Sequence, residues 1–168
     1  MAGAPQGPVY QVAVLETRQF EASPNPAEEM QAVLAAAAGV GDWADLYSAL
    51  DSARRLCIFH KQVLMAEGHL EGAVELVAAA VGNLRSSMVR NALLGVGDMF
   101  SFLGHDMARV DLRAMVAGTL QRLAGDKRFI CQTAAQAMEA AARKGPGVDV
   151  LHAILPGLED RNAEVSAK

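Results

Sequence analysis

Hydrophobic residues recur every three or four positions from Pro26 onwards, the spacing that places them on one face of an α-helix. Glycine, asparagine and aspartate interrupt this period at intervals, and these residues favour helix ends and turns. The pattern therefore predicts a series of short amphipathic helices. They cover residues 26–38, 43–60, 70–81, 88–103, 107–120, 129–144 and 148–155, and a further helix begins near Arg161.

Local signals define several of these helix ends. Asn25 can cap the first helix, and Pro26 occupies a first-turn position where its missing N–H costs nothing. Asp42 is a strong N-cap candidate for the second helix. Near the end of the chain, Pro156–Gly157 predicts a break between the last two helices.

Short polar turns recur within successive pairs of predicted helices, about 40 residues apart at first and closer together at the end. This period is typical of HEAT-type helical hairpins, which stack because a single hairpin cannot bury its own apolar face. We expect an all-α fold, an α-solenoid of about three and a half HEAT-type repeats over residues 26–168, truncated in the fourth repeat. In such a stack the turns lie along one edge: Gly41–Trp43, Gly82–Leu84, Gly125–Lys127 and Glu159–Asn162.

Residues 1–25 differ in pattern from the rest of the chain. Prolines at Pro5, Pro8 and Pro24 set the segment apart, and residues 9–20 alternate only partly between apolar and polar. We interpret the segment as an extended or disordered N-terminal arm. It is either a disordered or loosely docked tail, or a segment that pairs with a partner.

The composition favours helices and excludes several function classes. Apolar residues form 52% of the chain but aromatic residues only 5%, which suits helix–helix packing better than a pleated sheet. The net charge of −4 argues against general binding to nucleic acids or anionic membranes, which both need a basic surplus. Apolar stretches such as Ala73–Val81 are too short to span a membrane, and no secretory signal begins the chain. We therefore expect a cytoplasmic protein.

The sequence holds few candidate groups for catalysis or metal binding. Cys57, His60 and His69 are neighbours, but no further Cys or His pair completes a zinc site. The run Gly95–Asp98 lies inside a helical pattern, so its glycines indicate close helix approach and its aspartate the edge of that contact. Cys57 and Cys131 are expected to be buried reduced thiols. We predict a non-enzymatic protein without metal, cofactor or small-molecule substrate.

The predicted turns are more basic than the rest of this acidic chain, and the first carries its one tryptophan. Such a strip suits an acidic protein surface, because the indole fills a pocket while Lys and Arg attract and orient the partner. In the alternative interpretation, the tryptophan packs the first hairpin and the basic side chains are merely solvated. The candidate binding residues are Trp43, Arg85, Ser86, Lys127, Arg128, Arg161 and Asn162.

Several segments resemble a known family. Asn83–Ala92 followed by Gly97–Phe100, together with Asp42–Trp43 and Gly125–Ile130, is similar to the TOG domains of the crescerin family, the TOG-array regulators of axonemal microtubules. The TOG domains of CLASP proteins are the next most similar. The likeness extends over residues 24–168.

This resemblance implies a HEAT-repeat α-solenoid that binds tubulin or the microtubule lattice through its intra-repeat turns, with the candidate residues named above as its contacts. It also implies a cytoskeletal location in the axoneme of a cilium or flagellum, with other axonemal proteins as further partners. The alternative is a HEAT-repeat scaffold in a ciliary or cytoskeletal assembly that binds a protein other than tubulin.

Overall fold

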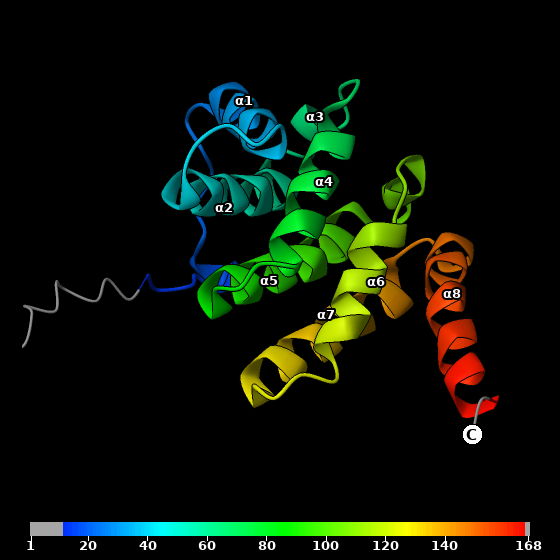
Figure 1. Cartoon of the computed structure of the whole chain (residues 1–168). Helices are drawn as coiled ribbons and strands as arrows, with labels where there is room; N and C mark the ends of the chain where they lie inside the picture. The colour runs from blue at the N-terminus through cyan, green and yellow to red at the C-terminus, as the bar shows by residue number, and fades with distance from the viewer. Residues whose placement is uncertain (1–11, 167–168) are drawn as a thin grey trace, which may run out of the picture.

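The computed structural model describes the backbone of residues 12–166 and the side chains of residues 12–158. Within this part of the chain every regular element is helical, which confirms the predicted all-α class (Figure 1). The elements are the 3-10 helices η1 (Thr17–Gln19) and η2 (Gly104–Arg109) and the α-helices α1 (Pro26–Ala37), α2 (Trp43–Phe59), α3 (Lys61–Leu64), α4 (His69–Val81), α5 (Ser86–Leu103), α6 (Arg113–Arg122), α7 (Arg128–Lys144) and α8 (Gly147–Ser166).

The long helices pack in two layers, and successive hairpins contribute one helix to each. α1, α4, α6 and α8 contact one another in that order, and α2, α5 and α7 form the second layer. The two helices of a hairpin also pack together, as α1 does with α2, α4 with α5 and α6 with α7. Figure 1 shows the hairpins following one another from α1 towards α8.

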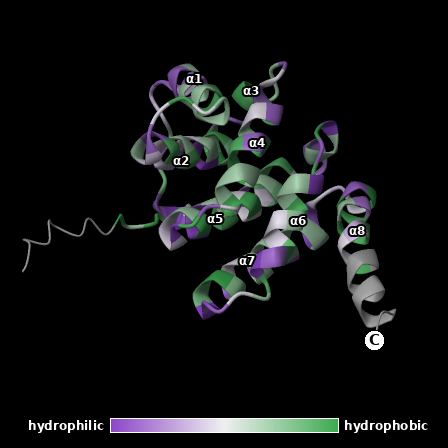
Figure 2. Ribbon diagram, viewed as in Figure 1, coloured by the Kyte–Doolittle hydropathy of each residue, from purple (hydrophilic) through white to green (hydrophobic). Residues whose placement is uncertain are grey.

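A continuous apolar core fills the space between the layers. Figure 2 shows hydrophobic positions on α4 and α5 in the middle of the molecule. Leu50, Val96 and Phe100 are inaccessible to solvent, and burying a side chain of this kind stabilises the fold by roughly 1.5–3 kcal/mol. A Cβ added to Gly97 would lie 3.8 Å from the Cα of Ala137, so α5 and α7 approach closely there, as expected.

The prediction that Asp98 lies at the edge of this contact is wrong. Its carboxylate is buried and accepts a hydrogen bond from Nε of Arg54 on α2 at 2.7 Å. Arg54 also donates from Nη1 to Oδ1 of Asn91 at 2.9 Å, and Asn91 donates to Asp51 at 2.8 Å. The opposite charges and these hydrogen bonds offset the cost of burying the groups, although Nη2 of Arg54 has no hydrogen-bond partner among the described residues.

Two helix starts differ from the sequence predictions. The Asn25 side chain makes no capping hydrogen bond to α1, and its own N–H donates to the Ser23 hydroxyl at 3.0 Å instead. The helix expected from Met107 begins only at Arg113, because η2 occupies the preceding residues. Asp111 favours this late start, since its carboxylate accepts the N–H of Arg113 at 3.0 Å.

The break predicted at Pro156–Gly157 is also wrong, because α8 continues through Pro156. A proline inside a helix removes one hydrogen bond and costs about 3 kcal/mol. α8 packs against α6, and this tertiary contact, not helix propensity, opposes the cost. Residues 159–162 are therefore helical and do not form the expected fourth turn.

Residues 12–25 of the predicted arm lie against the helices, and residues 1–11 fall outside the described residues. The segment is largely extended, apart from η1, and crosses α2 and α5. Phe20 is buried there, with the guanidinium carbon of Arg54 4.8 Å from its ring centroid.

Candidate protein-binding ridge

Three turns at the N-terminal ends of α2, α5 and α7 form one edge of the molecule. Because these helices pack side by side in the second layer, the turns that precede them follow one another in space (Figure 1). We call this edge the ridge and define it as residues 39–43, 82–86 and 123–129.

Two side-chain contacts join the turns of the ridge to each other. The guanidinium carbon of Arg85 lies 4.7 Å from the ring centroid of Trp43, a cation–π contact between the first and second turns. Such a contact at an exposed site is worth about 0.5–1 kcal/mol. Lys127 donates a hydrogen bond to the Ser86 hydroxyl, which joins the second turn to the third. Four of the predicted residues are thus brought together in one line.

The first turn is built around an aspartate capping box. Oδ1 of Asp42 accepts the N–H groups of Ala44 at 2.8 Å and Asp45 at 3.1 Å, while Asp45 accepts the N–H of Asp42 at 2.9 Å. Two backbone hydrogen bonds lower the pKa of Asp42, and the one from the Asp45 N–H contributes more than the one from the Ala44 N–H. Gly41 has a φ of +100°, and a Cβ there would lie 2.7 Å from the Asp45 side chain, so the turn requires glycine.

The second turn is fixed by an arginine from the following hairpin. Arg122 of α6 donates from Nε to the carbonyl of Val81 at 2.9 Å and from Nη2 to the carbonyl of Asn83 at 3.0 Å. The side chain of Asn83 accepts the N–H of Arg85 at 2.9 Å, which holds the start of α5. Sequence reasoning missed Arg122, because its position at a helix end carries no signal of what it will contact.

Besides the predicted Trp43, the ridge exposes large apolar side chains that sequence reasoning did not single out. Leu84 is 99% exposed at the tip of the second turn, and Trp43 is 41% exposed in the first. Val40 and Phe129 are exposed in the first and third turns. Apolar residues inside otherwise polar turns were the available sequence signal. Exposed apolar groups gathered on one edge are typical of a surface that binds another protein.

Charge is unevenly distributed along the ridge. The second and third turns carry the exposed basic residues Arg85, Lys127 and Arg128, with Asp126 beside them. The first turn carries the exposed carboxylate of Asp42, and the exposed Asp45 follows it at the start of α2. The ridge is therefore not uniformly basic, and its positive charge lies towards α5 and α7.

The predicted fourth contact point does not extend the ridge as a turn. Arg161 and Asn162 belong to α8, and their side chains lie outside the described residues. The four candidates joined by contacts, together with Arg128, are the part of the predicted set that the described side chains cover.

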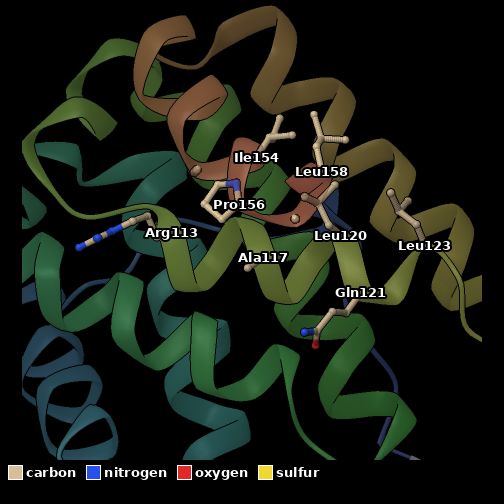
Figure 3. A pocket seen from close by; sticks show the side chains of 10 residues that line it. Arg113, Ala117, Leu120, Gln121, Leu123, Ile154, Pro156 and Leu158 are labelled. Atoms are coloured by element: carbon tan, nitrogen blue, oxygen red, sulfur yellow. The ribbon is translucent and has the colours of Figure 1, made fainter. Parts of the chain in front are cut away.

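A groove lies between α6 and α8, beside the third turn of the ridge. It has a volume of about 510 Å³. Figure 3 shows Ile154, Pro156 and Leu158 of α8 facing Ala117 and Leu120 of α6. The lining is mainly apolar, and the neighbouring Leu123 extends it towards the third turn of the ridge.

The residues considered for metal binding have structural contacts instead. Cys57 is buried, and that burial raises the pKa of its thiol. Nε2 of His60 accepts the N–H of Ser23 at 3.0 Å, and Nδ1 of His69 lies 2.7 Å from the Val63 carbonyl. Among the described residues, no three His, Cys, Asp or Glu side chains converge on a common point.

Cys131 differs from the expected buried thiol, because it is only partly buried and donates to the carbonyl of Gly125 at 3.0 Å. Its place at the first turn of α7 explains this exposure.

No helix in the described part of the chain is long and apolar enough to cross a membrane. Comparisons with protein-family models, curated proteins and solved structures give no match to this chain.

Proposed function

We propose that this chain is a non-catalytic TOG-like module of HEAT-type hairpins that binds tubulin or the microtubule lattice through the ridge. On this proposal, the module acts in the axoneme of a cilium or flagellum. The two-layer order of hairpins supports the HEAT-type interpretation, since each hairpin packs mainly against its neighbours along the stack.

The observation that carries the proposal is the continuous line of Trp43, Arg85, Ser86 and Lys127 across three turns, with Leu84 uncovered among them. Tubulin is a strongly acidic partner, which suits the basic second and third turns. The exposed apolar groups then supply the desolvated contacts that dominate binding energy at interfaces. Lys and Arg add attraction and orientation.

Replacement of the tryptophan tests this proposal. Trp43→Ala should weaken co-sedimentation with purified tubulin and microtubules by on the order of 2 kcal/mol, roughly thirtyfold, because an anchoring indole is lost. Phe59→Ala is the matched control, since Phe59 is also 41% exposed but lies at the opposite end of α2. Thermal melts check that both variants stay folded. If Trp43→Ala lowers the melting temperature but not the binding, Trp43 only packs the first hairpin.

The second candidate is a HEAT-type scaffold that binds a protein other than tubulin in a ciliary or cytoskeletal assembly. The carboxylates of Asp42 and Asp45 beside Trp43 favour it, because an acidic first turn repels an acidic partner. The wild-type chain in the same assay separates the two: the scaffold binds neither soluble tubulin nor microtubules at low salt.

A further inference from the structure

The described part of the arm, residues 12–25, connects the first hairpin to the second (Figure 1). It is called the arm from here on. The carbonyl of Leu15 accepts a hydrogen bond from Nη1 of Arg54 on α2 at 2.7 Å. The hydroxyl of Thr17 donates to Asp98 on α5 at 2.6 Å, and Glu16 forms an ion pair with Arg90 of α5 at 2.6 Å. The arm therefore bridges two helices that belong to different hairpins.

Phe20 anchors the other end of this bridge. Its buried ring lies beneath the guanidinium groups of Arg54 and Arg55, at 4.8 and 5.4 Å from the ring centroid. Further along, the N–H of Ser23 donates to His60 at 3.0 Å. The arm is thus held by side chains of the helices, in the way that a peptide is held in a binding groove.

The groups that receive the arm also join the helices to each other. Arg54 pairs with Asp98 and donates to Asn91, while the same Arg54 and Asp98 side chains bond to Leu15 and Thr17 of the arm. The docked arm covers the Arg54–Asp98 pair, and exclusion of water strengthens the attraction between the two charges. Docking of the arm and packing of α2 on α5 therefore reinforce each other.

The bridge lies close to the ridge on α5. Arg90, the partner of Glu16, follows Ser86 by about one helical turn of α5. On α2 the arm contacts Arg54 and Arg55, about three turns after Trp43. Because α2 is one continuous helix, a change in its packing on α5 also moves Trp43 relative to Arg85.

We propose that the arm is a brace that regulates the ridge. The docked arm holds Trp43 against Arg85, and the undocked arm lets the first two turns separate and weakens partner binding. The consequence for binding rests on the proposed function, whereas the effect on Trp43 concerns this chain alone.

The single tryptophan allows the brace to be tested in the full chain without a partner. Thr17→Val removes the hydroxyl that donates to Asp98 and keeps the side-chain shape. We expect acrylamide quenching of Trp43 fluorescence to rise towards the level measured in Arg85→Ala, a variant in which Trp43 has lost its cation–π partner. Thr17→Ser keeps the hydroxyl and restores the wild-type quenching constant. Arg18→Ala, exposed in the same 3-10 helix, leaves it unchanged.

A second variant tests docking directly. Phe20→Ala removes the anchor, and a synthetic peptide of residues 12–24 added in excess should return the quenching constant towards the wild-type value. Unchanged quenching in both Thr17→Val and Phe20→Ala, with helical content retained in circular dichroism, overturns the brace. If Phe20→Ala loses helical content, the result of Thr17→Val alone is used, and unchanged quenching in that variant overturns the brace.

Tubulin binding of the same variants is measured separately. Weaker binding of Thr17→Val than of Arg18→Ala supports regulation of the ridge by the arm. Altered quenching in Thr17→Val, with no tubulin binding by the wild-type chain, contradicts the proposed function and supports the brace. Normal quenching in Thr17→Val, with tubulin binding by the wild-type chain, overturns the brace and leaves the proposed function standing.

Discussion

Single residues between α2 and α5 decide how the first two hairpins fit together. Arg54 and Asp98 stand on the core-facing sides of their helices, where the periodicity predicts apolar residues. The sequence signal was a pair of opposite charges at core positions of two helices. Periodicity alone could not identify them as partners, because it gives the face of each helix but not the register between helices.

Tyr47 gives a prediction about pH. Its hydroxyl is buried and has no hydrogen-bond partner among the described residues. Burial, and next the charge of Asp51, raise the pKa of Tyr47 to about 12, whereas an unfolded tyrosine titrates near 10. Between about pH 10 and 12 the unfolded chain therefore releases this proton before the folded chain does, and the stability of the fold falls as pH rises.

Tyr47→Phe has no hydroxyl to ionise and therefore lacks this loss of stability at high pH. The free energy of unfolding of the variant should gain on that of the wild type as pH rises through this range, measured by urea titration at several pH values. Comparison of the two chains removes the contribution of lysines that titrate at similar pH. A difference that stays constant with pH would show that Tyr47 ionises equally in both states.

At the scale of helices and turns, periodicity predicted most of the elements correctly. It failed where local hydrogen bonds or tolerated residues override the pattern: Asp111 delays the start of α6, and Pro156 lies inside α8. The four-residue α3 (Lys61–Leu64) is too short to show a period and was missed. The extended backbone of the arm gives no indication in sequence of where it docks.

The junction between α7 and α8 gives a prediction at this scale. A Cβ on Gly145 would lie 2.6 Å from the Ala141 carbonyl oxygen and 2.8 Å from Cδ1 of the buried Phe100. Gly145→Ala should therefore cost about 1–3 kcal/mol of unfolding free energy, because neither neighbour can yield easily. Gly147→Ala is the control, since nothing lies within 4 Å of its added Cβ. Equal urea midpoints for the two variants would contradict this packing.

At the scale of the whole molecule, the ridge follows from the side-by-side packing of α2, α5 and α7. The repeat period predicted four turns on one edge, whereas the structure has three there and the expected fourth is part of α8. The chemistry of that edge was less predictable. Contacts such as Arg85 on Trp43 depend on the offset between hairpins, and the exposure of Leu84 depends on how far the second turn projects. Neither quantity is encoded in a single-helix pattern.

The proposed binding of tubulin by the ridge depends on its most exposed apolar side chain, Leu84. Because Leu84 is 99% exposed, Leu84→Asp places a charge in the proposed contact without disturbing the core. Val148→Asp is the control, at a 66% exposed position on α8. In co-sedimentation with purified tubulin and microtubules, Leu84→Asp should lose binding while Val148→Asp and both melting temperatures match the wild type. Wild-type binding by a folded Leu84→Asp chain would show that the ridge is not the contact surface.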